Sequence, residues 1–233
     1  AAIMVTGSHN PKNHNGFKIV LKNKSFYGKQ IQQLYQCITK QEFQNGIGKL
    51  ITKDLKNDYI SELLKRSGPF PNLKVIWDCG NGATGEIISK VVKKIPGKHK
   101  VLFGEIDGNF PNHHPDPTIE KNLIHLKNSL KTEKADLGIS FDGDGDRIGV
   151  VSKDSNLISG DLLTSFLSGS ILKKNKNQKI ILDVKSSEKA IKSIEEQNGV
   201  AVISKTGHSL IKEKIKELNA PLAGEMSGHI FFS

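Results

Sequence analysis

Short apolar segments alternate with longer amphipathic ones along almost the whole chain, and this alternation restricts the possible fold more than any other feature. The apolar segments predict strands at residues 17–21, 73–77, 100–103, 137–141, 148–152, 179–182, 200–203 and near 230–232. The amphipathic segments predict helices at 29–43, 51–65, 86–94, 119–130, 162–172, 188–196 and 210–218. Most connections contain a helix and are long enough to join parallel strands, whereas segment 148–152 is open to antiparallel pairing. The sequence therefore predicts an α/β fold with mixed, mostly parallel sheets flanked by helices.

Two strand–turn–helix segments look alike, which predicts tandem related α/β units. Residues 74–78 and 179–183 both end an apolar strand in Asp and then pass through small residues into a helix. The glycine-containing stretch 45–48 and the polar region 154–160 are candidate boundaries. We therefore expect domains at residues 1–47, 48–156 and 157–233, and a long loop at 109–117, which is rich in Pro, Asn and His.

Composition limits the classes of function. No apolar run approaches the roughly 20 residues that span a bilayer, and no secretory signal is visible, so we expect a cytoplasmic protein without a membrane partner. Cys37 and Cys79 are too few for a disulfide framework. The net charge of +10 would suit nucleic acid or a small anionic substrate. Because the lysines are spread along nearly every predicted helix and aromatic residues are only 6%, we expect the small substrate and no nucleic acid.

Asp142, Asp144 and Asp146 alternate with glycines between two predicted strands, and Arg147 follows them directly. Three neighbouring anions repel one another, and the glycines lose much entropy on ordering, so folding alone does not explain the run. A bound cation would offset the repulsion, and all-oxygen ligation suits Mg²⁺ before softer metals. We therefore predict a metal site here, with Arg147 as a functional residue or a brace for the loop, rather than a solvated acidic turn.

Three further segments carry candidate functional groups. Ser8 and His9 follow an apolar run, so Ser8 fits a nucleophile or phosphate carrier, although a plain turn before Pro11 is equally compatible. Residues 225–229 place a carboxylate, a hydroxyl and an imidazole on one loop, as suits a polyhydroxylated ligand. Residues 206–209 precede a helix and fit anion binding or ordinary capping. The G-x-G-x-x-G pattern at 80–85 is compatible with a dinucleotide or with a tight turn, and a dinucleotide would leave the acidic run unexplained.

Taken together and in order, the segments 6–11, 142–147 and 224–229 resemble the α-D-phosphohexomutase superfamily, and its phosphomannomutase/phosphoglucomutase branch most of all. Residues 15–18 and 205–209 share the resemblance, and Met226 is typical of the mannose/glucose branch. The resemblance implies an enzyme, a phosphotransferase of the isomerase class. It would interconvert hexose 1-phosphate and hexose 6-phosphate, of mannose, glucose or both, through a phosphoserine and a hexose 1,6-bisphosphate.

The resemblance also assigns roles to individual residues. Ser8 would carry the phosphoryl group, and an oxygen of that group would share Mg²⁺ with Asp142, Asp144 and Asp146, while glucose 1,6-bisphosphate would act as activator. Glu225 and Ser227 would bind sugar hydroxyls. The remaining positions that match residues lining the family's cleft are His9, Lys18, Arg147, Lys185, His208 and His229. Of these, His9 and Lys18 would take part in proton transfer or phosphate stabilisation.

The family has four domains around a central cleft, and this chain matches only part of that plan. It begins just before the serine segment 6–11 and ends just after the segment 224–229, which binds the sugar in the family, so we expect an incomplete first domain, an incomplete third domain and no fourth domain. The fourth domain supplies the family's main phosphate-binding loop, so we expect the 233 residues alone to be inactive or nearly so. The preferred hexose and the oligomeric state stay open.

Three rival interpretations remain. Residues 144–148 approximate the Asp-x-Asp signature of Mg²⁺-dependent phosphatases of the haloacid-dehalogenase type, although Ile148 is not the expected residue. A calcium-binding EF-hand would need Gly at Arg147 and Glu at Lys153, so it fails twice. A basic nucleic-acid binder is the non-enzymatic alternative.

Overall fold

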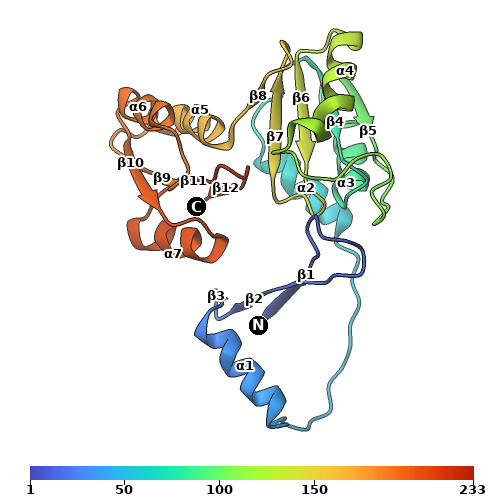
Figure 1. Ribbon diagram of the computed structural model, residues 1–233, viewed down its shortest axis with the longest axis vertical. Helices are drawn as coiled ribbons and strands as arrows, with labels where there is room; N and C mark the ends of the chain where they lie inside the picture. Colours follow the sequence, from blue (N-terminus) through green and yellow to red (C-terminus); the bar gives the residue numbers. More distant parts are fainter.

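The computed structural model describes residues 1–233 as three units, each with its own sheet (Figure 1). The first unit holds strands β1 (Ala2–Val5), β2 (Phe17–Leu21) and β3 (Lys24–Phe26), followed by helix α1 (Lys29–Thr39). Its three strands are antiparallel in the order β1-β2-β3. An extended connection then leads from α1 to the second unit (Figure 1).

The second unit contains a five-stranded sheet in the order β5-β4-β6-β7-β8. Its elements are α2 (Lys56–Arg66), β4 (Leu73–Asp78), α3 (Thr84–Val91), β5 (Gly97–Leu102), the 3₁₀ helix η1 (Glu120–Leu123), α4 (Ile124–Glu133), β6 (Leu137–Phe141), β7 (Ile148–Ser152) and β8 (Leu157–Ile158). β4 pairs in parallel with β5 and β6, whereas β7 is antiparallel to both β6 and β8. The metal-loop segment 142–147 is the short connection between β6 and β7.

The third unit contains a four-stranded sheet in the order β10-β9-β11-β12. Its elements are α5 (Gly160–Leu172), β9 (Lys179–Asp183), α6 (Glu188–Glu196), β10 (Val200–Ser204), α7 (His208–Leu218), β11 (Leu222–Gly224) and β12 (Ile230–Phe232). β9 pairs in parallel with β10 and β11, and β12 returns antiparallel to β11. The order and direction of these four strands repeat those of β5, β4, β6 and β7, so the predicted internal repeat is present in the topology.

The hydrophobic cores repeat as well. Ile76 on β4 packs with Leu126 and Leu130 of α4, and Ile181 on β9 packs with Ile211 and Ile215 of α7. Both helices end in a residue with positive φ, at Lys134 and Asn219, which turns the chain into the next strand. A second cluster fills the other face of the third sheet, between it and helices α5 and α6. The two sheets are therefore covered by helices in the way that related α/β units require.

The predicted α/β fold class is confirmed, with mixed sheets flanked by helices. The sheets are not mostly parallel, because four strand pairings are parallel and five are antiparallel, including both pairings of the first sheet. Strand β2 and helix α6 have the predicted bounds, and no helix or strand forms within 109–117. The strands β1, β3, β8 and β11, which are two to four residues long, were not predicted. None of the helices is both long and apolar enough to cross a membrane.

The prediction of a helix from residue 51 is wrong at its beginning. Helix α2 starts at Lys56, and the preceding Leu50 and Ile51 are 92% and 75% exposed. These apolar side chains do not pack against the rest of the protein. Helical propensity without tertiary packing is marginal over a few turns, which explains the later start. The predicted helix 29–43 likewise ends at Thr39, and Gln41 has a positive φ of 56°.

Candidate active site

The serine loop, residues 6–11, follows β1 and holds Ser8 in an uncommon backbone conformation. Ser8 has φ of 51°, in the left-handed region that residues other than glycine seldom adopt. Its backbone N–H donates to Thr6 Oγ1 over 3.0 Å, and the backbone N–H of Thr6 donates to Gly16 O over 2.9 Å. The loop is thereby fixed to the end of β2. Strain of this kind persists where the surroundings enforce it, and it is frequent at functional sites.

The metal loop, residues 142–147, brings three carboxylates together between β6 and β7. One oxygen each of Asp142, Asp144 and Asp146 can be chosen so that all three lie within 4.8 Å of one another. Asp142 is fully buried, and this burial, together with the charge of Asp144, raises the pKa of its carboxyl. A divalent cation would relieve that repulsion, so the residues present fit the predicted oxygen-ligated site.

The serine loop and the metal loop are in direct contact. Ser8 Oγ donates to Asp142 Oδ2 over 2.9 Å, and Thr6 Oγ1 donates to Asp144 Oδ2 over 2.6 Å. Gly143 makes this approach possible, since a Cβ at that position would lie 2.0 Å from Ser8 O. The candidate nucleophile therefore lies beside the carboxylates that would hold the metal.

Lys18 comes from β2 and adds a cation to the same group. Its ammonium contacts Asp146 Oδ2 and lies 3.6 Å from Asp144 Oδ2. Burial would lower the pKa of Lys18, but the hydrogen bond to Asp146 and that residue's charge outweigh it, so the pKa is raised. Lys18 is therefore charged at neutral pH.

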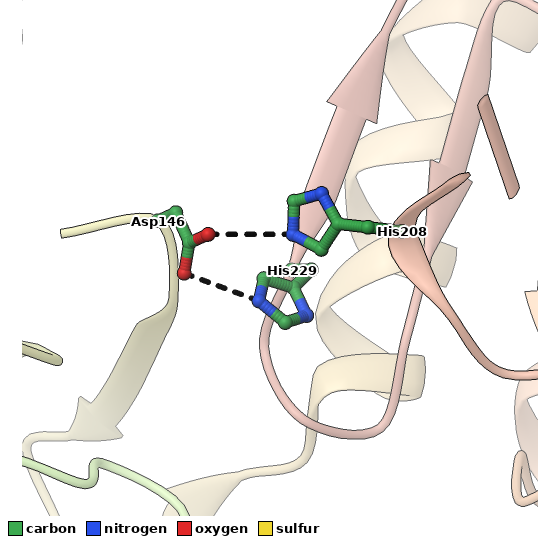
Figure 2. Close-up of side chains that lie close together, drawn as sticks. All are labelled: Asp146, His208 and His229. Atoms are coloured by element: carbon green, nitrogen blue, oxygen red, sulfur yellow. Dashed lines mark hydrogen bonds and ion pairs between the residues drawn. The ribbon is translucent and has the colours of Figure 1, made fainter. Parts of the chain in front are cut away.

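Asp146 also connects the metal loop to two histidines of the third unit (Figure 2). His208 Nε2 lies 3.3 Å from Asp146 Oδ2, and His229 Nε2 lies 3.1 Å from Asp146 Oδ1. Burial disfavours the charge on Asp146, but His208, His229 and Lys18 outweigh that effect and hold the pKa of the carboxyl far below its usual range. Burial also opposes the charge on His229, yet Asp146 and Glu225 raise its pKa to about 9.

The sugar loop, residues 225–229, connects β11 to β12 and lies against the metal loop. Glu225 is buried and accepts the backbone N–H of Gly207 over 2.6 Å, and its other oxygen lies 2.7 Å from His229 Nδ1. Burial alone would raise the pKa of Glu225, but these two partners lower it. Ser227 Oγ lies 2.9 Å from the same His229 nitrogen. Gly228 O accepts the N–H of Ile148 over 3.1 Å, which joins the sugar loop to the first residue of β7, directly after the metal loop.

The other predicted site residues differ in their placement. His9 Nδ1 lies 3.0 Å from Ser8 Oγ. The backbone N–H of Arg147 donates to Asp142 Oδ1 over 3.1 Å, and its Nε lies 3.8 Å from Asp142 Oδ2 and 3.3 Å from His229 Nε2. Lys185 follows β9, is exposed, and makes no ion pair. The structure thus gathers the predicted residues around the metal loop, except for Lys185.

Sequence reasoning missed the groups that support these loops. Thr6 holds both the serine loop and Asp144, and only its place two residues before Ser8 could have indicated this. Asp78 is fully buried at the end of β4 and binds His113 Nε2 through both oxygens, at 3.0 and 3.1 Å. The next residue, His114, packs edge-on against His9. The Asp that ends each repeated strand was the available signal.

The glycine pattern at 80–85 supports the metal loop from behind. Ala83 N donates to Gly143 O over 2.8 Å, and a Cβ on Gly82 would lie 2.7 Å from that same oxygen. Asn81 donates its side-chain N–H to Glu105 O over 2.8 Å. The close contacts of this segment in the structure are therefore with the metal loop and with the chain after β5.

Comparison with known proteins gives a consistent result. Sequence models of the phosphoglucomutase/phosphomannomutase alpha/beta/alpha domains I, II and III match residues 1–45, 52–156 and 159–233. Phosphomannomutase/phosphoglucomutase of Pseudomonas aeruginosa is 43% identical over 232 residues, which cover 100% of this chain and 50% of that protein. Phosphoglucomutase of Neisseria meningitidis serogroup A is 41% identical over 234 residues, covering 100% of this chain and 51% of the relative.

A solved structure agrees in fold. The crystal structure of a phosphoglucomutase/phosphomannomutase family protein from Burkholderia thailandensis superposes with a TM-score of 0.94 at 43% identity, and the match covers 99% of this chain and 50% of that one. The chain thus spans about half the length of the relatives it matches. These matches support the resemblance to phosphohexomutases and give no support to the phosphatase alternative.

Proposed function

This chain belongs to the phosphoglucomutase/phosphomannomutase family, and on that basis we propose that it interconverts hexose 1-phosphate and hexose 6-phosphate through a phosphoserine at Ser8. The substrate would be a phosphosugar of mannose, glucose or both, and glucose 1,6-bisphosphate would prime the serine. The observation that carries the proposal is the 2.9 Å contact between Ser8 Oγ and Asp142, since it places a strained serine beside three carboxylates of another unit.

Mg²⁺ would be held by Asp142, Asp144 and Asp146, together with an oxygen on Ser8. When bound, it would neutralise charge that develops on the transferred phosphoryl group. Lys18 supplies a further positive charge from β2 at the same place. Phosphoryl transfer asks a protein mainly for positioning and charge neutralisation, and these residues provide both.

The reaction also requires proton movement. When the sugar hydroxyl takes the phosphoryl group, a new O–P bond forms and the bond to Ser8 Oγ breaks. The hydroxyl proton would pass to solvent, and the residue that protonates the leaving Ser8 oxygen would recover its proton from solvent. His9 Nδ1, 3.0 Å from Ser8 Oγ, is placed to give the serine its proton and to remove it when the serine is phosphorylated again. The bisphosphate intermediate would then turn over so that its other phosphate faces Ser8.

The third unit would hold the sugar. Glu225 and Ser227 offer a carboxylate and a hydroxyl for the sugar hydroxyls, and His229 connects them to Asp146 of the metal loop. His208 faces the same Asp146 (Figure 2). Lys185 is exposed and without an ion pair, so its ammonium is available to a phosphate group of the substrate. The net charge of +10 would favour the approach of such anions.

Label transfer tests the proposal. The chain is incubated with radiolabelled glucose 1,6-bisphosphate and Mg²⁺, and the labelled residue is mapped by peptide mass spectrometry. We expect an acid-stable label on Ser8 that is absent in Ser8→Ala and retained in the control Ser25→Ala, which lies on β3 of the same unit. Equal labelling of Ser8→Ala, or an aspartyl phosphate in the metal loop, would contradict the proposal. Because the chain spans about half the length of its relatives, the assay scores label on Ser8 rather than net turnover.

A further inference from the structure

A second set of metal-binding side chains lies beside the oxygen ligands of the metal loop. Asp146 of the second unit faces His208, the first residue of α7, and His229, which directly precedes β12 (Figure 2). One ligand atom from each of the three lies within 4.8 Å of the others. We propose that Asp146, His208 and His229 form a metal site between the second and third units that binds a borderline divalent ion such as Zn²⁺.

The spacing of the three residues fits such an ion. The ring nitrogens of His208 and His229 lie 3.3 and 3.1 Å from oxygens of Asp146. Zn²⁺ with bonds of about 2.0–2.1 Å in tetrahedral geometry separates its ligand atoms by about 3.3–3.4 Å. The two nitrogen–oxygen distances are close to this edge length, and one ligand atom from each residue lies within 4.8 Å of the others. The distances run to different oxygens of Asp146, so the carboxylate would bind the ion through both oxygens or rotate to present one of them.

The chemistry of the donors distinguishes this site from the oxygen ligands next to it. Two imidazoles and one carboxylate favour zinc and neighbouring transition metals, whereas three carboxylates favour Mg²⁺. His229 has the support that metal-binding histidines have in known sites, because its Nδ1 lies 2.7 Å from Glu225 Oε2 while its Nε2 faces Asp146 Oδ1 at 3.1 Å. A metal bound at Nε2 would replace the contacts that this nitrogen makes with Asp146 Oδ1 and Arg147 Nε. Gly207 N in turn fixes the other oxygen of Glu225.

His208 supplies an independent observation. Both of its ring nitrogens are buried and lack a hydrogen-bond partner, although Nε2 lies 3.3 Å from Asp146 Oδ2. Buried polar atoms without a partner are rare in folded proteins, and each one needs an explanation. A metal ion bound at Nε2 would satisfy one of them.

The site is accessible, and its present cations would be displaced. A cavity of about 630 Å³ is lined by Asp146, His208 and His229 and offers a path for an ion. Lys18 contacts the same carboxylate, and Arg147 Nε lies 3.3 Å from His229 Nε2. A bound ion would take the place of Lys18 on Asp146. Because the metal loop also uses Asp146, the two sites would compete for this carboxylate.

Titration with Co²⁺ tests the proposal without reference to phosphoryl transfer. Co²⁺ substitutes for zinc, and its visible absorption is far stronger in four-coordinate sites than in octahedral oxygen sites. We expect His208→Ala to weaken this binding by about tenfold or more, and Zn²⁺ to displace the signal. Asp142→Asn removes one of the oxygen ligands and none of the three side chains proposed here, so it is expected to leave the signal intact. The control His125→Ala on α4 should leave it intact as well.

A second variant covers the case in which His208→Ala perturbs folding, which circular dichroism would reveal. Lys18→Met removes the competing ammonium and should tighten Co²⁺ binding severalfold. The proposal is overturned if Asp142→Asn abolishes the signal while His208→Ala and Lys18→Met leave it unchanged, because the ion would then lie among the three aspartates. Unchanged binding in all variants overturns it as well. Since the readout is metal binding, failure here leaves the proposed phosphoserine chemistry untouched.

Discussion

The second and third units use one arrangement of strands for two different chemistries. In both, a central strand ends in a buried Asp, and a short loop joins the last parallel strand to an antiparallel return strand. In the second unit that loop carries Asp142, Asp144 and Asp146, whereas in the third it carries Glu225, Ser227 and His229. The strands therefore determine the position of the loop, whereas a few side chains within the loop determine whether it suits metal ligation or contact with a polar ligand.

The two loops also meet each other, because each unit presents its loop at the carboxyl end of its parallel strands. Gly228 O accepts Ile148 N, and a Cβ on Gly228 would lie 2.5 Å from Ile148 O. The glycine at this contact is required by space and by its φ of 89°. The duplicated arrangement therefore places the two chemistries face to face.

The largest expected difference between the loops is in label transfer to Ser8. Asp142→Asn should slow Mg²⁺-dependent transfer by about a thousandfold or more, because metal-based charge neutralisation is worth several kcal/mol. Glu225→Gln should instead raise the phosphosugar concentration needed for half-maximal transfer by about 10- to 100-fold, with Mg²⁺ dependence unchanged. Rapid-quench labelling at varied Mg²⁺ and sugar concentrations measures both. A common loss of Mg²⁺ dependence in the two variants would show that the loops do not divide the chemistry.

The hydrophobic cores of the second and third units, unlike their loops, should lose similar amounts of stability when equivalent residues are shortened. Ile76 and Ile181 occupy equivalent, fully buried positions under α4 and α7. Each change to Ala should lower the free energy of unfolding by about 3 kcal/mol, through lost burial and the cavity left behind. Urea unfolding followed by circular dichroism measures this, with Ile51→Ala, at an exposed position, as a control that stays near wild type. A loss in only one unit would mean that the two are not packed equivalently.

The two buried aspartates at the strand ends anchor different partners. Asp78 binds His113 and the backbone N–H of Gly80, whereas Asp183 accepts hydrogen bonds from Ser186 and Thr206. Asp78→Asn should cost about 2 kcal/mol of stability and Asp183→Asn about 1 kcal/mol, because a bond between charged groups is worth more than one from a hydroxyl. Thermal unfolding of the two variants measures the difference. Equal losses would argue that the charge on His113 contributes nothing.

The smallest expected effect is a pH dependence at the strand-end anchor of the second unit, between Asp78 and His113. His113 faces Asp78 and lies beside the rings of Phe103 and His125. Its Nδ1 lies 3.0 Å from the backbone oxygen of His114. Burial lowers the pKa of His113, but Asp78 outweighs it, and the net shift is upward.

Because the pKa in the folded state is raised, the contribution of His113 to stability is present in full below about pH 6.5 and is lost as pH rises through the folded value. At the matching strand end of the third unit, Asp183 accepts a hydrogen bond from the uncharged hydroxyl of Ser186. Hydrogen exchange of residues 109–117 should therefore increase with pH, after correction for the intrinsic rate, more than exchange of residues 184–187. His113→Gln should remove the excess, and persistence of the excess in that variant would contradict the assignment.

Much of this arrangement was predictable because its signals are local. The alternation of apolar strands with amphipathic helices, and the Asp that ends both 74–78 and 179–183, indicated related α/β units. The acidic run 142–147 indicated a cation site, since three anions in one loop have no structural purpose of their own. By contrast, the helix predicted from residue 51 starts later, because its first turn has nothing to pack against, and β11 is too short to be recognised without its neighbours.

The order of residues by itself determined the kinds of element, their repetition and the chemical groups available at each loop, because these depend on spacing and side-chain type within a few residues. Only the tertiary structure decided that Ser8 touches Asp142 across 134 positions of sequence, and that Asp146 faces His208 and His229 rather than its own neighbours alone. The reason is that contacts between units depend on how separately folded sheets present their loops to one another, and no local pattern records that geometry.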